Sequence, residues 1–96
     1  MPKALWIAHV TVTDEDAYAE YAKRAGPAIT DHGGEFMARA GRFEYLEGTP
    51  RPRNVVARFP SFEAARDCYH SAAYQEALSF AKGAADRELM IVEEIE

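Results

Sequence analysis

The sequence contains a single cysteine, Cys68, among its 96 residues. One cysteine excludes an internal disulfide and leaves no Cys/His cluster for a metal, so we expect a reducing compartment, the cytoplasm. Long apolar runs are also missing. The segment 1–9 lacks the apolar stretch of a signal peptide, and no run approaches the roughly 18 apolar residues of a membrane span. The sequence therefore predicts a protein that is neither exported nor inserted into a membrane.

Positive charge is scarce as well. Lys and Arg number 11 against 16 Asp and Glu, which gives a net charge of −5. Nucleic acids and anionic membranes are polyanions that need a basic surface, so this balance argues against both partners. The sequence has no Gly-rich phosphate loop, no H-x-x-x-H or C-x-x-C metal spacing and no G-x-S-x-G elbow. We therefore expect neither a metal nor a cofactor.

What is present is an ordinary globular composition, with 48% hydrophobic and 28% charged residues. Because no linker or low-complexity tract divides the chain, we expect one domain over residues 1–96. A chain of this length hides only about 60–65% of the surface that its unfolded form exposes. Self-association is a common remedy for such a small core.

The segment 4–12 predicts a strand in which both faces are largely apolar. Alternation places Trp6, Ala8, Val10 and Val12 on one face, and Leu5, Ile7, His9 and Thr11 on the other. A strand between a core and water has one polar face. The sequence therefore indicates that something covers the second face too.

Two helical patterns follow. Thr13 or Asp14 can cap a helix whose buried stripe we expect to kink or break at Gly26-Pro27; the stripe is Tyr18, Tyr21, Ala22, Ala25 and Ile29. Ser61 can cap a second helix, Ser71 can recap it, and Gly83 is a plausible end.

Strand patterns fill the remainder. In residues 35–40, alternation places Phe36, Ala38 and Ala40 opposite Glu35, Met37 and Arg39; residues 42–46 continue in an extended pattern before a Gly/Pro loop at 48–52. Residues 54–59 and 88–92 predict the last two strands. The order βαββαβ is that of an α+β ferredoxin-like domain, with a four-stranded antiparallel sheet and two helices on one face. The exposed apolar side chains of residues 4–12 then predict a homodimer formed through the open face.

Two residues on that open face are candidates for chemistry. Alternation gives His9 and Arg39 the same face, where an imidazole suits proton transfer and a guanidinium can hold a carboxylate or enolate oxygen. The structural alternatives are a hydrogen-bonded interface histidine and a salt-bridged arginine.

Other candidates are weaker. Tyr69 and His70 lie late in the second helix, where they can line a cavity or remain ordinary core and surface residues. Cys68 and His70 point about 100° apart on a helix, so they form no dyad, and Cys68 is more often a core residue. A basic segment containing Arg39, Arg42, Arg51, Arg53 and Arg58 either rims an anion site or pairs with acidic neighbours.

Nearly the whole chain resembles the domain-of-unknown-function 1330 family of the dimeric α/β-barrel superfamily. The resemblance is carried by Trp6-Ile7, Val10, Val12, Asp14, Tyr18, Tyr21, Gly33-Gly34, Phe36, Arg39, Gly41, Leu46-Glu47-Gly48, Arg53, Val55-Val56, Phe59-Pro60-Ser61, Ala64, Tyr69, Ser71 and Tyr74-Gln75. The chain departs from the pattern at Ala40, where a glycine is usual, and at Ala73, near which a proline commonly falls.

The resemblance implies two subunits packed sheet to sheet but no assigned catalytic residues. Relatives in the superfamily include cofactor-independent monooxygenases, lactone isomerases, haem-handling enzymes and ligand-sensing domains. We therefore expect a homodimer that binds a small anionic or carbonyl compound near His9 and Arg39, with Tyr69 and His70 further out. In an enzyme His9 would move a proton and Arg39 would stabilise an oxyanion. The alternatives are a non-catalytic interaction or ligand-sensing module and, resting on His70 alone, haem binding.

Overall fold

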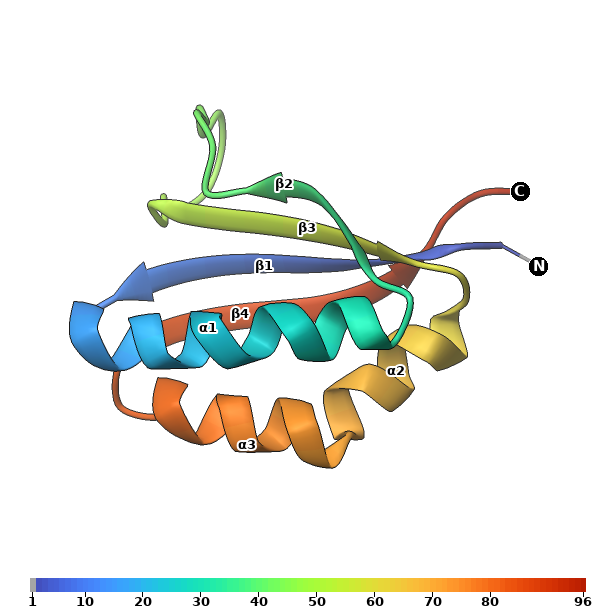
Figure 1. Ribbon diagram of the computed structural model, residues 1–96. Coiled ribbons are helices and arrows are strands. Elements are labelled where there is room, and N and C mark those ends of the chain that lie inside the picture. Colours follow the sequence, from blue (N-terminus) through green and yellow to red (C-terminus); the bar gives the residue numbers. More distant parts are fainter. Residues whose placement is uncertain (1) are drawn as a thin grey trace.

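A computed structural model describes residues 2–96, so Met1, the first residue of the expected domain, lies outside the described part. Along the chain run β1 (Ala4–Val12), α1 (Glu15–Asp31), β2 (Glu35–Arg39), β3 (Arg53–Phe59), α2 (Phe62–His70), α3 (Ala72–Ala81) and β4 (Ala85–Glu93). The strands form one antiparallel sheet in the order β2-β3-β1-β4. Figure 1 shows all three helices on one face of this sheet. The predicted ferredoxin-like fold is confirmed.

The helices begin where short polar side chains cap them. Asp14 accepts from the amide of Ala17, Ser61 from that of Ala64, and Ser71 from that of Tyr74. Ser71 thus ends α2 and starts α3, as its sequence position predicts. The expected break at Gly26-Pro27 does not occur, because α1 continues through Pro27 to Asp31.

The core lies between the helices and the inward face of the sheet. Trp6, Ala8 and Val10 of β1 are buried there, as the alternation predicts. Trp6 packs against Phe59 and Tyr74 with ring centroids 5.2 and 5.0 Å away. Its indole Nε1 donates to the carbonyl of Ala65 at 3.0 Å, which ties β1 to α2.

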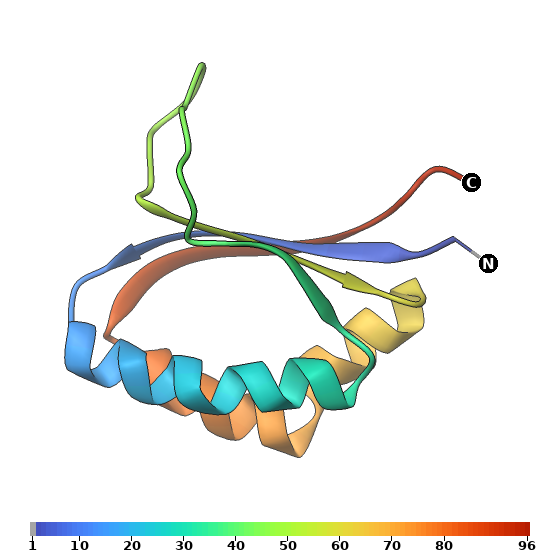
Figure 2. The ribbon, with the colours of Figure 1, turned by 45° about the horizontal axis from the view of Figure 1, so that its top comes forward.

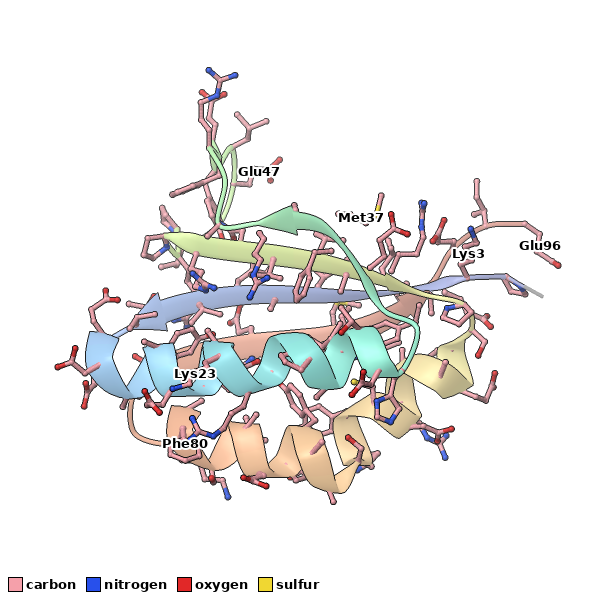
Figure 3. All side chains as sticks on the ribbon, viewed as in Figure 1. Lys3, Lys23, Met37, Glu47, Phe80 and Glu96 are labelled. Carbon is pink, nitrogen blue, oxygen red and sulfur yellow. The ribbon has the colours of Figure 1, made fainter. Side chains whose placement is uncertain are left out.

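An irregularity in β2 changes the predicted faces. Phe36 pairs with Ala57 and Arg39 with Val55, with a register shift between Phe36 and Ala38. Since Ala57 and Val55 both belong to the inward face, the bulge puts Arg39 on the same side as Phe36. Figure 3 shows Met37 on the opposite side, away from the helices. The prediction that Arg39 lies on the open face with His9 is therefore wrong.

Residues 40–52 form a long loop, so the extended pattern expected for residues 42–46 adds no strand. Figure 2 shows this loop rising from the sheet on the side opposite the helices. Within the loop, the hydroxyl of Tyr45 donates a hydrogen bond to Asn54 Oδ1 of β3 at 3.0 Å, which ties the loop to the sheet. The loop tip exposes Leu46, which is 84% accessible.

Two strands begin earlier than predicted. β3 starts at Arg53 and β4 at Ala85, and β4 pairs with β1 along its whole length. Both extensions bring an arginine, Arg53 and Arg87, into the sheet. The two chain ends also meet, because the amide of Glu94 donates to the carbonyl of Lys3 at 2.8 Å. Within residues 2–96, no helix combines the length and apolar character needed to span a membrane.

Ala40, just after β2, has φ +56°, a left-handed backbone conformation. A Cβ in this region costs roughly 1–2 kcal/mol, which explains why glycine is usual here. We predict that Ala40→Gly stabilises the fold by about 0.5–1 kcal/mol, after the greater freedom of unfolded glycine is subtracted. Urea unfolding measures the change. Ala73→Gly, on the exposed side of α3, is the matched control and should destabilise; a loss of stability in Ala40→Gly would contradict the strain.

Candidate functional site

A cavity of about 40 Å³ lies between α1 and the inward face of the sheet. The inward face of α1 is built from small residues at this point, Ala22, Ala25 and Gly26, which leaves the space open. The sheet contributes Trp6, Ala8, Phe36, Val55, Ala57 and Leu89; the remaining walls are Tyr18, Tyr21, Ile29, Arg39, Arg53 and Arg87. The walls are therefore apolar apart from three arginines and two tyrosine hydroxyls.

Arg53 and Arg87 flank the same residue of the central strand. Val10 pairs with Arg53 on one side and with Arg87 on the other. Directly paired residues share a face, so both arginines lie on the inward face, with backbones roughly 10 Å apart across two strand spacings. Two positive charges thus lie beneath the helices at the same level of the sheet.

Neither arginine has an anionic partner among residues 2–96. The ion pairs found there involve Arg24, Lys23, Arg51 and Arg58, and none includes Arg53 or Arg87. The Nε atoms of both arginines are buried and lack a hydrogen-bond acceptor within the same residues. An unpaired buried polar group costs free energy, and residues 2–96 supply neither Nε–H with an acceptor.

Aromatic rings hold the guanidinium groups instead of carboxylates. Arg53 lies 5.5 Å from the centroid of Tyr18, and Arg87 lies 4.7 Å from that of Tyr21. A ring face attracts a cation through its quadrupole while leaving the N–H groups at the guanidinium edge free. The charge therefore remains available to an incoming anion.

Two tyrosine hydroxyls meet beside Arg87. The Oη atoms of Tyr21 and Tyr74 are 2.8 Å apart, and Arg87 Nη2 donates to them at 2.9 and 3.3 Å. The contact between the hydroxyls uses one of their two hydrogens. The other has no acceptor among residues 2–96, so the pair offers one further donor.

Burial raises the pKa of both Tyr21 and Tyr74, because the cavity disfavours a phenolate. Both hydroxyls therefore stay protonated at neutral pH. Together with the two buried Nε–H groups, they form a cluster that donates hydrogen bonds and has no carboxylate, imidazole or amine among the cavity walls. This cluster, Arg53, Arg87, Tyr21 and Tyr74, is hereafter the donor cluster. It is suited to holding an oxyanion.

His9 lies on the other face of the sheet. Its Nδ1 donates to Asn54 Oδ1 at 2.6 Å, and Tyr45 Oη donates to the same oxygen at 3.0 Å. In the neutral ring this bond keeps the proton on Nδ1 and leaves Nε2 unprotonated. His9 is thus held in place by Asn54, but the sheet separates it from the cavity and from Arg39.

The other predicted site residues are scattered. Arg39 is exposed at the cavity mouth, 4.3 Å from the ring of Phe36. Tyr69 lines a separate groove beside α3 and packs on Trp6 and Tyr74. His70 is exposed and contacts only the edge of Tyr69 among these residues. The structure brings no two of His9, Arg39 and His70 together.

The arginines of the basic segment also lie in different surroundings. Arg58 forms a double hydrogen bond with Glu94, at 2.7 and 3.1 Å, and Arg51 lies 3.8 Å from Glu88. These two pair with acidic neighbours, whereas Arg53 enters the cavity. Cys68 is fully buried, and burial raises the pKa of its thiol to about 11. It is a core residue rather than a nucleophile.

The family model of the domain of unknown function DUF1330 matches residues 3–95. The chain belongs to this family. No curated protein matches it.

Solved structures similar to this DUF1330 chain share its fold at low identity. A protein of unknown function from Rhodopseudomonas palustris is 22% identical with a TM-score of 0.77, over 99% of this chain and 84% of that one. A cofactor-independent oxygenase from Streptomyces nogalater is 11% identical with a TM-score of 0.67, over 100% and 96%. A dimeric protein of unknown function from Bacteroides fragilis is 9% identical with a TM-score of 0.58, over 96% of both chains.

The sequence pattern predicts strands over residues 54–59 and 88–92, which begin one and three residues after the observed starts of β3 and β4. Arg53 and Arg87 fall outside these predicted strands, so the pattern does not predict the donor cluster of this DUF1330 chain. A signal was present: Arg87 continues the alternation of Ala85, Leu89 and Ile91. An arginine at an inward strand position is rarely buried without a partner.

The raised tyrosine pKa values give a spectroscopic prediction. In the folded protein, Tyr21→Phe should leave the 295 nm absorbance titration unchanged up to pH 11, because Tyr21 does not ionise there. In concentrated urea, where every tyrosine is exposed, the absorbance change of Tyr21→Phe near pH 10 should be smaller than that of the wild type by the contribution of one tyrosine. A loss of amplitude in the folded protein below pH 11 would contradict the burial effect.

The same shift has a consequence for stability. Above pH 10 the folded state keeps the Tyr21 proton that the unfolded state releases, so stability falls as pH rises further. One such proton contributes about 1.4 kcal/mol per pH unit. We predict a shallower fall between pH 10 and 11 for Tyr21→Phe than for the wild type, measured by urea unfolding at each pH.

Proposed function

We propose that this chain acts as a single-domain homodimer in the cytoplasm that binds a small organic anion, or a carbonyl compound whose oxygen becomes negative. The ligand oxygen binds at the donor cluster. The observation that carries the proposal is the pair of inward arginines on either side of Val10 without a carboxylate partner. An anion between them relieves their repulsion and satisfies both buried Nε–H groups.

A reaction at this site would pass through an enolate. Loss of a C–H proton beside a carbonyl places negative charge on the carbonyl oxygen, where Arg53 and Arg87 stabilise it. The cavity walls include no His, Asp, Glu or Lys, so the substrate must be acidic enough to give its proton to water. The fold shared with a cofactor-independent oxygenase supports an oxygenase- or isomerase-like enzyme of this kind.

The alternative is a non-catalytic ligand-sensing or interaction module. The same lack of a base in the walls favours it, since such a site binds an anion without changing it. Turnover separates the two proposals. A bound compound recovered unaltered after long incubation in air supports the module, whereas its conversion supports the enzyme.

The dimer is proposed through the open face of the sheet. There Met90, Ile7 and Val56 lie side by side as an apolar row across three strands, and Met90 is 52% exposed. Polar groups follow one row further, with Glu88, His9 and Asn54 side by side. The match to a dimeric ferredoxin-like protein supports this assembly. A second copy covers the apolar row and leaves the cavity under the helices free.

Trp6 is the only tryptophan and lines the cavity, so its fluorescence reports binding there. We predict that a panel of small carboxylates, including acetate and benzoate, changes this emission in a saturable way. Arg53→Met or Arg87→Met should weaken the affinity at least tenfold, because a charged hydrogen bond contributes about 1.5–3 kcal/mol. Circular dichroism checks that each variant is folded.

Two variants serve as controls for this experiment. Arg66→Met removes an exposed arginine of α2 and should bind like the wild type. His9→Ala should also bind normally, because His9 lies across the sheet from the cavity. Undiminished binding in folded Arg53→Met and Arg87→Met, or a loss of binding in His9→Ala, would overturn the proposed site.

The proposed dimer is tested by Ile7→Arg, which places a charge in the middle of the apolar row. We expect native mass spectrometry to show a dimer for the wild type and a monomer for the variant, since burying an unpaired charge is costly. Ala19→Arg, on the exposed side of α1, is the matched control and should remain dimeric. A monomeric wild type would refute the assembly.

A further inference from the structure

A second hollow lies beside the cavity, between α3 and the edge strand β4. Its volume is about 400 Å³, and its walls include Tyr69, Leu78, Ala81, Lys82, Ala85 and Leu89. We call it the α3/β4 groove. Figure 1 shows α3 on the helix side of the sheet, so a dimer through the open face leaves the groove that α3 lines accessible.

Arg87 and Leu89 border both the cavity and the α3/β4 groove. Arg87 is therefore the one charged side chain in residues 2–96 that is common to the two walls. No Asp or Glu lines either space. A molecule held at Arg87 has the side chains of Leu78, Ala85 and Leu89 beside it in the groove and meets no carboxylate in either wall.

The sizes of the two spaces differ about tenfold, 40 Å³ against 400 Å³. Sites that enclose a drug-sized molecule occupy roughly 300–1,000 Å³, so the cavity has room only for a small polar group. The groove has room for an apolar chain. The cavity and the groove thus suit different parts of one ligand: a small polar head in the cavity and an apolar chain in the groove.

We propose that the ligand is an amphipathic anion, an alkyl or aryl carboxylate, with its head at Arg87 and its apolar part in the α3/β4 groove. This inference rests on the anion binding of the proposed function and adds its substrate class. Lys82 and Arg87 both line the groove and give it a positive charge, which favours an anion over a neutral or cationic amphiphile. Leu78, Ala85 and Leu89 provide the surface that the chain covers.

The test compares acetate with octanoate by isothermal titration calorimetry. Octanoate should bind the wild type at least about tenfold more tightly, because each buried methylene contributes to affinity. Ala85→Phe fills the groove and should reduce that advantage to about threefold or less while acetate affinity is unchanged. Leu78→Gln, which removes apolar surface from the groove, should act in the same direction. Ala19→Phe, on the outer side of α1, is the matched control and should keep the full advantage.

The outcomes separate the two proposals. If acetate binds but octanoate binds no more tightly, or if its advantage survives in both Ala85→Phe and Leu78→Gln, the groove has no role and the amphipathic ligand is refuted. Failure of both acids to bind the wild type would refute the anion site itself. A loss of octanoate's advantage confined to the groove variants supports the inference.

Discussion

The candidate site depends on how two arginines, Arg53 and Arg87, are accommodated on the face of the sheet that the helices cover. Arg53 and Arg87 are half-buried, with their Nε atoms shielded from water, and no carboxylate lies against them in residues 2–96. The helices that pack above these two arginines supply their contacts. Helix α1 supplies Tyr18 and Tyr21 as ring partners, and α3 supplies the hydroxyl of Tyr74. Small residues of α1 leave a cavity between the helix and the sheet that a ligand can fill.

The choice of ring partners matters for function. A glutamate beside either arginine would neutralise it and close the site, because a buried ion pair satisfies both of its members. A tyrosine ring stabilises the cation by roughly 0.5–2 kcal/mol without neutralising it, although Arg87 also uses Nη2 to donate to the hydroxyls of Tyr21 and Tyr74. The protein is negatively charged overall, at −5, yet its cavity is positive. Selectivity for the proposed anion would therefore come from local geometry rather than from net charge.

The sequence predicted the layers of the fold better than the contents of the site. Alternation in residues 4–12 identified both faces of β1 correctly, because a regular strand has a strict period of two. The bulge near Met37 breaks that period, and a local backbone irregularity has no signature in side-chain pattern alone. One extra residue was enough to move Arg39 from the open face to the cavity mouth. Strand ends are equally hard to place, which is why the inward strand positions of Arg53 and Arg87 were not predicted.

The two faces of β1 also have a consequence for how such proteins diverge. Even-numbered positions from Trp6 to Val10 border the cavity side, and odd-numbered positions from Leu5 to Thr11 border the open face. A single nucleotide change in this stretch therefore alters the environment of one surface while leaving the other largely unchanged. Natural selection can vary what the sheet binds beneath its helices and what it meets on its open side along separate evolutionary paths. A nine-residue strand thus carries two independently evolvable surfaces on one backbone.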